Sequence, residues 1–310
     1  MSKLGFGICN AIGNTPIVYI KGNPNYYAKL EGFNPFGSIK DRAAFFVMKE
    51  SYKQNIISKT TEIIESSSGN FAIALAAVCQ LYGNKFTCVV DPSLTPLNHQ
   101  IIQCYGADLI FADVADDNGS YLKNRLEKVN QLLSNNKELY WINQYNNPLM
   151  RRAYTETICA ELCNSFEFID YLFVPVSTCG VIAGLSIGIK DKYPKTKIIA
   201  VDIKGSRIFC ENPSGKRYIP GMGASIVPGN LQYSIIDDIV HVHEKDVIRH
   251  CTELLSQSIL VGGSSGAVSA AIEKYFCYKK SECVIVAIFP DRGERYLSNI
   301  YDARWNDCFA

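Results

Sequence analysis

Short runs of β-branched and aliphatic residues alternate along the chain with longer stretches of helical period. TEIIES (61–66), KFTCVVD (85–91) and DYLFVPV (170–176) have apolar centres, which is typical of strands buried on both faces. Apolar residues recur at helical spacing in NFAIALAAVCQLYG (70–83) and VIAGLSIGIKDKY (181–193). The alternation predicts an α/β fold with mostly parallel sheets covered by helices.

The same rhythm restarts after residue 145, which predicts two αβα domains. We expect a smaller N-terminal domain, 1–145, and a larger C-terminal domain, 146–310, with part of 11–34 crossing to the larger one. Further strands are predicted at 108–113, 197–202 and 283–289, and further helices at 96–107, 121–133, 149–163, 244–257 and 265–276.

Charge and cysteine content narrow the class of protein. Lys and Arg number 31 and Asp and Glu 30, so no broad basic surface favours nucleic acid or an acidic membrane. No apolar run is long enough for a transmembrane helix, and the N-terminus lacks the apolar core of a signal peptide. Twelve scattered cysteines without a C-x-x-C are typical of reduced thiols in a cytoplasmic protein. Cys159 and Cys163 could share a helix face, but they lack a histidine partner for a metal.

Lys40 stands at an unfavourable place in NPFGSIKDRAA (34–44). A turn-rich loop runs there directly into a helical stretch, and the N-terminus of a helix disfavours a positive charge. A solvated surface lysine beside Arg42 is one interpretation. The other is an amine nucleophile whose pKa is lowered by burial and by the helix end.

Three more loops rich in small polar residues follow predicted strands, where α/β sheets bind ligands. ESSSGN (65–70) suits a carboxylate, VSTCG (176–180) offers amides and hydroxyls to a phosphate, and GGSSG (262–266) precedes a helix. Each loop alone is equally consistent with ordinary helix capping. Together with a lysine, they indicate a cofactor that carries a phosphate and an aldehyde, which is pyridoxal phosphate.

These motifs, with IPGMGAS (219–225) and PDRGERYL (290–297), resemble the fold-type II β-substituting enzymes of the cysteine synthase and cystathionine β-synthase family. The resemblance spans roughly residues 10–303. TCVVDPSLTPLNHQII, YLKNRLEKV, YWINQYNNP and RYIPGMGASIVP are most similar to the N-(2-amino-2-carboxyethyl)-L-glutamate synthases of siderophore pathways. That branch implies condensation of O-phospho-L-serine with L-glutamate, release of phosphate, an α-aminoacrylate intermediate, and a homodimer.

The resemblance also implies roles for individual residues. Lys40 would form the Schiff base, Asn70 would bind the pyridoxal 3′-oxygen, and Ser264 would face the pyridine nitrogen. A neutral serine there favours β-elimination over transamination. Ser67, Ser68, Asn70, Phe71 and Gln144 would hold the substrate carboxylate, and Ser177, Thr178, Cys179, Gly180 and Val181 would hold the cofactor phosphate.

Three positions depart from the family pattern. Phe36 replaces a glycine before the lysine, which predicts a reshaped loop. Cys179 and Val181 replace glycine and threonine, so one hydroxyl contact to the phosphate is lost. Phe71 and Ala72 replace threonine and glycine, which makes the pocket edge bulkier and counts against a plain sulfide-using cysteine synthase.

Several further residues have two interpretations. Arg125 is either a ligand for the leaving phosphate or a solvated neighbour of Lys128, and Tyr145 either contacts the second substrate or packs between the domains. On the predicted helix at 121–133, Arg125 lies beside the apolar stripe, whereas Lys123 falls outside it. Asp291, Arg292 and Glu294 either line the far side of the cofactor or form a salt-bridged turn. His241 and His243 are expected to be a solvated pair instead of a metal site.

Two alternative functions remain open. Within the enzymes, the chain could be a cysteine synthase that uses O-phosphoserine or O-acetylserine, or a cystathionine β-synthase-like enzyme. Outside them, it could be a ligand-binding regulatory protein that kept the fold and lost the chemistry, as the altered residues Cys179 and Val181 allow.

Overall fold

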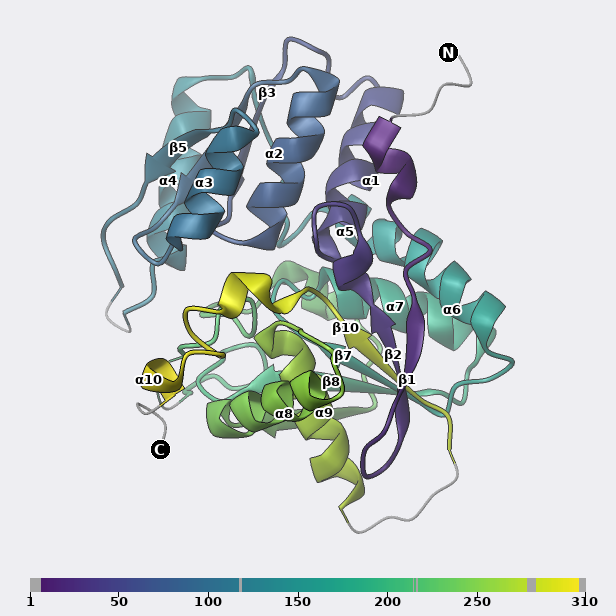
Figure 1. The fold of residues 1–310 in the computed structure, drawn as a ribbon. Coiled ribbons are helices and arrows are strands. Elements are labelled where there is room, and N and C mark those ends of the chain that lie inside the picture. The colour runs from purple at the N-terminus through teal and green to yellow at the C-terminus, as the bar shows by residue number, and fades with distance from the viewer. Residues whose placement is uncertain (1–6, 117–118, 214, 216, 278–282, 307–310) are drawn as a thin grey trace.

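Two mostly parallel sheets, each flanked by helices, organise the chain (Figure 1). The computed structural model describes residues 7–116, 119–213, 215, 217–277 and 283–306. This architecture confirms the predicted α/β fold. None of the helices in the described part of the chain combines the length and apolar character needed to cross a membrane. No disulfide joins the eleven cysteines that lie in it.

The smaller sheet has four parallel strands in the order β5-β4-β3-β6. Helices α1, α2 and α3 lie on one side and α4 on the other. Both faces of β3 are therefore apolar. Ile63 packs into the apolar core on the side of α1 and α2, and Ile64 packs into a smaller core on the side of α4. The elements are α1 (Lys40–Lys53), β3 (Glu62–Ser66), α2 (Asn70–Tyr82), β4 (Phe86–Val90), α3 (Pro96–Cys104), β5 (Asp108–Phe111), α4 (Leu122–Asn135) and β6 (Leu139–Trp141).

The larger sheet has six strands in the order β1-β2-β10-β7-β8-β9. Its first two strands come from the start of the chain, and β1 alone is antiparallel to its neighbour. The strands are β1 (Ile17–Ile20), β2 (Tyr26–Leu30), β7 (Tyr171–Pro175), β8 (Lys197–Ile203), β9 (Asp238–Val242) and β10 (Ile285–Phe289). The sequence pattern did not predict β1, β2 or β6, because tyrosine, lysine or tryptophan interrupts their aliphatic residues. Lys29 of β2 is nevertheless buried.

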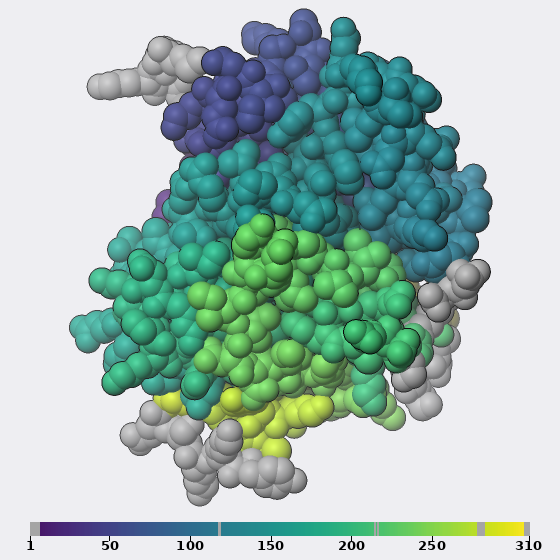
Figure 2. Space-filling model, turned by 180° about the vertical axis from the view of Figure 1, so that it is seen from behind, coloured from purple at the N-terminus to yellow at the C-terminus, as the bar shows by residue number. Residues whose placement is uncertain are grey.

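Helices α8 and α9 cover one face of the larger sheet, and α5, α6 and α7 cover the other. Helix α1 packs against both α2 and α5, so a single apolar core continues from the smaller sheet to the larger one. Seen from behind, the early segments form the upper part of the molecule and the later ones the lower part (Figure 2). The remaining helices are α5 (Pro148–Tyr154), α6 (Ala160–Ser165), α7 (Gly180–Lys192), α8 (Glu244–Ser256), α9 (Gly263–Phe276) and α10 (Ala303–Asn306).

The helix predicted at 149–163 is divided by a π-helical turn, Thr155–Cys159. Helix α7 approaches it closely at this point, and the Thr155 hydroxyl donates to the carbonyl of Gly184 at 2.8 Å. Inserted π turns of this kind are a known way for a helix to accommodate a close neighbour. Sequence periodicity did not reveal it, because both segments keep their apolar side toward the core.

Candidate active site

Loops from both sheets meet between the two sheets, at the carboxyl ends of parallel strands. The loop after β3 contacts the loop after β10, because the Asn70 side chain donates to Asp291 at 2.6 Å. The loop after β6 contacts the loop after β3, since Gln144 Nε2 donates to the carbonyl of Ser66 at 3.0 Å. Residues that the sequence placed in separate motifs are thus brought to one site.

Lys40 is the first residue of α1, as the sequence predicted. Its backbone N–H donates to the Ser38 hydroxyl at 3.2 Å. Burial lowers the pKa of the Lys40 amine to about 8, although nearby Cys179 and Asp291 act in the opposite direction. By its solvent-accessible surface, Lys40 is half-buried. An amine with this pKa has a substantial unprotonated, nucleophilic fraction near neutral pH.

The loop after β3 presents backbone amides at the start of α2. The Ser67 hydroxyl accepts hydrogen bonds from the N–H groups of Gly69 at 3.4 Å and Ala72 at 3.3 Å, so it caps the helix. Among the described residues, no group accepts a hydrogen bond from the N–H of Asn70 or Phe71, as expected for a first helical turn. Phe71 itself is buried in the core. This loop offers an anion two amides and the hydroxyls of Ser67 and Ser68.

The loop after β7 has the form of an anion site at a helix N-terminus. Cys179 precedes α7 with a left-handed backbone, φ +58°, and has no side-chain cap. The N–H groups of Gly180 and Val181 belong to the first turn and lack intrahelical acceptors. The Ser177 hydroxyl donates to the carbonyl of Gly223 at 3.1 Å, and Thr178 is buried beside it. Five of the predicted residues therefore form one continuous cradle.

Asn230 joins two of these loops, and sequence reasoning missed it. Its side chain is fully buried and donates to the carbonyls of Gln144 at 2.9 Å and Thr178 at 3.1 Å. The Arg151 Nη1 group donates to the Oδ1 atom of Asn230 at 2.9 Å. In the sequence, Asn230 is distinguished only by its position a few residues after the IPGMGAS motif. That position does not indicate which residues it contacts.

Glu65 is a second residue that the sequence did not single out. Its carboxylate accepts hydrogen bonds from the N–H groups of Ser66 at 2.7 Å and Gln144 at 3.2 Å, and from Trp141 at 3.3 Å. Burial raises the pKa of this carboxyl to about 7, although these donors lower it. Glu65 thereby fixes the loop that carries Ser67 and Ser68 against β6.

Ser264 and Asp291 approach the site from the larger sheet. Ser264 lies in the first turn of α9, and Asp291 follows β10; both are buried. Burial raises the pKa of the Asp291 carboxyl, while the donors Tyr296, Asn70 and Ser264 and the charge of Arg295 lower it. Arg292 and Glu294, by contrast, pair with each other at the surface. For those two residues the salt-bridged turn is the correct interpretation.

Phe36 reshapes the loop before Lys40 in a defined way. Its ring is buried and packs edge-on against Tyr105 at 6.1 Å between centroids. Its N–H donates to the Asp41 carboxylate at 2.6 Å. Gly37 then takes φ +89°, a conformation that favours glycine. The bulky side chain therefore points into the core, and the turn after it leads to Lys40.

The side chain of Arg125 on α4 points toward the loop after β3, which contains Ser68. Its Nη1 lies 3.4 Å from the Ser68 hydroxyl, and its Nε lies 3.1 Å from Asp91. Lys123 on the same helix has a side chain that is 71% exposed, and its ion pair is with Glu127. The two cations thus take the inward and outward orientations that the apolar stripe predicted.

Tyr145 is buried next to Gln144. Burial raises the pKa of its hydroxyl, and the charges of Arg125 and Arg217 lower it. The phenol therefore stays protonated at neutral pH, and the carboxylates of Glu65 and Asp91 act on it in the opposite direction to the two arginines. Its position is compatible both with packing and with contact to a substrate.

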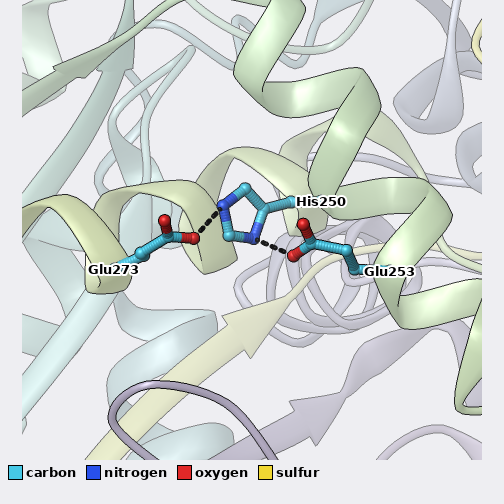
Figure 3. A group of neighbouring side chains, drawn as sticks. All are labelled: His250, Glu253 and Glu273. Atoms are coloured by element: carbon cyan, nitrogen blue, oxygen red, sulfur yellow. Dashed lines mark ion pairs between the residues drawn. The ribbon is translucent and has the colours of Figure 1, made fainter.

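The histidines do not contribute to this site. His241 lies in β9 and His243 precedes α8. His250 of α8 lies between Glu253 and Glu273, with ring nitrogens 3.3 Å and 2.8 Å from their carboxylates (Figure 3). This spacing would suit a metal ion, but Arg249 donates to both carboxylates. Their negative charge is thereby already compensated, and the cluster holds α8 against α9.

Comparison with known proteins agrees with this geometry. Residues 8–291 match the family described as pyridoxal-phosphate dependent enzymes. The chain belongs to this family. It is a β-substituting enzyme, and pyridoxal phosphate is its cofactor. The interpretation as a binding protein that lost the chemistry is therefore not supported.

Solved structures of similar enzymes cover almost the whole chain. An O-acetylserine-dependent cystathionine β-synthase from Helicobacter pylori is 29% identical, with a TM-score of 0.89, over 97% of this chain and 100% of that one. A hydrogen sulfide-producing enzyme from Fusobacterium nucleatum is 31% identical, with a TM-score of 0.87, over 96% and 99%. An O-ureido-L-serine synthase is 27% identical, with a TM-score of 0.87, over 96% and 95%.

The residues of the site fit pyridoxal phosphate. The cofactor needs an amine for its aldehyde, donors for its phosphate and polar groups around its ring. Lys40 supplies an amine whose pKa is lowered by burial, and the first turn of α7 supplies N–H groups beside Cys179, which acts on that amine. Asn70 and Ser264 both hydrogen-bond Asp291, whose charge also acts on Lys40. All of these groups belong to the one set of loops described above.

Proposed function

We propose that this enzyme condenses O-phospho-L-serine with L-glutamate to give N-(2-amino-2-carboxyethyl)-L-glutamate and phosphate. The observation that carries the proposal is the inward orientation of Arg125, whose guanidinium lies 3.4 Å from Ser68. A departing phosphate is a dianion at neutral pH, and the arginine fork suits it. The motif resemblance to the glutamate synthases supports the choice of acceptor.

Lys40 carries the proton transfers in this proposal. Bound pyridoxal phosphate withdraws electrons from the attached amino acid, which acidifies the proton on Cα and allows a β-substituent to leave. Lys40 takes that proton as general base and later returns it, and its pKa of about 8 suits both directions near neutral pH. Ser264 would face the pyridine nitrogen as a neutral group, which would favour β-replacement.

The donor carboxylate is held by the loop after β3. The free N–H groups of Asn70 and Phe71 and the hydroxyls of Ser67 and Ser68 surround it, and Gln144 completes the set. Asp91 holds the Nε side of Arg125 and so directs the two Nη groups toward the donor. Tyr145 lies beside Gln144, where Arg125 and Arg217 would attract the anionic acceptor glutamate and the carboxylates of Glu65 and Asp91 oppose them.

A second candidate is β-replacement with sulfide or homocysteine on O-acetylserine. The observation in its favour is the similarity to enzymes of that kind, an O-acetylserine-dependent cystathionine β-synthase among them. Asp91 also counts toward it, because a carboxylate 3.1 Å from Arg125 reduces the positive charge available to a phosphate.

The deciding experiment compares donors in the Arg125→Ala variant. We expect kcat/KM for O-phosphoserine to fall by roughly ten- to a hundredfold, because a charge-assisted hydrogen bond contributes about 1.5–3 kcal/mol. The value for O-acetylserine should change much less, since acetate carries one charge and departs without the arginine fork. Product formation is measured with glutamate, sulfide and homocysteine as acceptors.

Lys123→Ala is the matched control, because Lys123 lies on the same helix and points to solvent. The Lys123→Ala substitution should leave kcat/KM unchanged for both O-phosphoserine and O-acetylserine. Equal losses on the two donors in Arg125→Ala would show that Arg125 is structural. Much faster turnover of sulfide or homocysteine than of glutamate would assign the reaction to the second candidate.

A further inference from the structure

The segment that follows β10, Pro290–Tyr296, lies between the two sheets and contacts the loops of the smaller one (Figure 1). The carbonyl of Pro290 accepts the N–H of Ile39 at 2.7 Å, immediately before Lys40. Ser38 and Asp291 also form an isolated β-bridge. The last strand of the fold thus supports the loop that presents the lysine.

Two side chains of this segment hold opposite ends of the Asn70 amide. Asn70 Nδ2 donates to Asp291 Oδ2 at 2.6 Å, and Arg295 Nη1 donates to Asn70 Oδ1. A guanidinium can only donate and a carboxylate can only accept. The two partners therefore allow one orientation of the amide and exclude the flipped one.

This arrangement decides what Asn70 has left for a ligand. Its oxygen is engaged by a charged donor, and one of its two Nδ2 hydrogens is engaged by Asp291. The other N–H lies beside the Tyr296 hydroxyl, which itself donates to Asp291. Since both engaged and remaining hydrogens are on Nδ2, Asn70 meets a ligand as a hydrogen-bond donor. In the proposed placement of the cofactor, the group facing it is the 3′-oxygen of the ring, which is an acceptor when it is anionic.

We propose that Arg295 and Asp291 are positioning residues that fix Asn70 as a donor to the 3′-oxygen of pyridoxal phosphate. The inference rests on the proposed role of Asn70, and it is independent of which donor and acceptor the enzyme uses. Sequence analysis named Asp291 but not Arg295, although both belong to the PDRGERYL motif.

Arg295 also connects Asn70 to the lysine loop. Its Nη2 donates to the carbonyl of Phe36, and a Cβ on Gly37 would lie 3.1 Å from the same nitrogen. Asp291 in turn is held by the Tyr296 hydroxyl and lies close enough to Lys40 to influence its pKa. Arg295 and Asp291 therefore fix the position of Asn70 relative to Lys40, the residue proposed to bind the same cofactor.

If Arg295 and Asp291 had a purely structural role, their substitution would have a different experimental effect from that expected of positioning residues. As a staple between the sheets, Arg295 would contribute to stability and leave the electronic state of the bound cofactor unchanged. As a positioning residue, it acts on the cofactor only through Asn70. Spectra of the purified holoenzyme without substrate separate the two, because the band intensities report where the shared proton of the Lys40 Schiff base resides.

The test compares Arg295→Gln, Asp291→Asn and Asn70→Ala with the double variant Arg295→Gln/Asn70→Ala. Removing a donor to the 3′-oxygen favours the proton on that oxygen, which transfers absorbance from the visible to the near-ultraviolet band. We expect the band ratio to change by about two- to tenfold, as for one hydrogen bond. The double variant should match Asn70→Ala alone, because Arg295 acts through Asn70.

Arg292→Gln is the matched control, because Arg292 stands three residues away, is exposed and pairs with Glu294. It should keep the wild-type spectrum. The proposal is overturned if Arg295→Gln changes only thermal stability, or if its spectral effect persists in full without Asn70. An unchanged spectrum in Asn70→Ala would refute the placement of the cofactor itself, whatever the donor assay shows.

Discussion

At the scale of single residues, Lys40 explains why a cation was placed at a helix N-terminus. Burial removes most of the preference of the amine for its charged form, and the helix end no longer opposes a neutral group. Asp291 and Cys179 counteract this effect only in part. The residue is therefore set up as a nucleophile and base by its surroundings, and its own sequence neighbours show only that its position is unusual.

We predict that the apoenzyme captures pyridoxal phosphate with a rate that rises with pH around a midpoint near 8. Below that pH the Lys40 amine is protonated and cannot attack the aldehyde; above it the neutral amine predominates. The rate is followed by the growth of visible absorbance after mixing. Lys40→Ala should give no such signal, and a wild-type midpoint near the ordinary lysine value of 10.5 would contradict the prediction.

At the scale of elements, two glycines four residues apart, Gly184 and Gly188, allow α7 to pack closely against its neighbours. A Cβ on Gly184 would lie 2.3 Å from the Arg151 carbonyl oxygen, and one on Gly188 would lie 2.7 Å from the Cys159 sulfur. Helix α5 and the π turn after it occupy this space. The loop at the start of α7 is therefore positioned by contacts far along the helix.

Gly184→Ala should lower the free energy of unfolding by about 1–3 kcal/mol, because overpacking outweighs the better helix propensity of alanine. Denaturant unfolding of the holoenzyme measures it. Ile187→Ala is the control, since Ile187 lies on the same helix and is 41% exposed. A Gly184→Ala protein as stable as the wild type would show that α5 can move aside without cost.

At the scale of the whole molecule, a network of ion pairs connects β2 near the start of the chain with helices α1 and α6. Glu161 of α6 binds Lys29 of β2 at 2.6 Å and Arg42 of α1 at 2.6 Å, and Arg42 also binds Glu31 at 2.6 Å. Breaking one member of such a network leaves the others buried without their counter-charge. The network therefore fixes α1, with Lys40 at its beginning, against the larger sheet.

Glu161→Gln should lower the free energy of unfolding by about 3–5 kcal/mol at neutral pH. Burial alone would raise the pKa of Glu161, but Arg42, Lys29 and the Asn14 N–H lower it to about 2. Its contribution is therefore complete above the unfolded value of 4.5 and is lost as pH falls toward 2. Stability curves of the two proteins should converge over that range.

Glu156→Gln is the control for this comparison, since Glu156 is exposed and pairs with Arg152 on the surface. It should change stability by less than about 1 kcal/mol. A Glu161→Gln protein whose deficit is the same at low and neutral pH would show that the network does not depend on the Glu161 charge.

The sequence by itself determined which segments form the central strands and helices, and that small polar loops follow the strands. Those features are local: period-two and helical spacing, turn residues and the position of Lys40 can be recognised within a few residues. The resemblance added roles for Asn70, the phosphate loop and Ser264. The inward side of Arg125 was also indicated locally, because it lies two residues from Lys123 and thus about 200° around the helix from it.

Only the tertiary structure decided which distant segments meet. Asn70 and Arg295 are 225 residues apart, and nothing near either one encodes the contact. Asn230 looked like an ordinary loop residue until its amide was seen to join Gln144 and Thr178. Tyrosine and lysine interrupt the aliphatic residues of β1 and β2, so neither strand is recognised alone, and β2 is stabilised by pairing with β10 from the opposite end of the chain. Strand pairing and side-chain contacts of this range depend on how the whole core packs, so no local pattern specifies them.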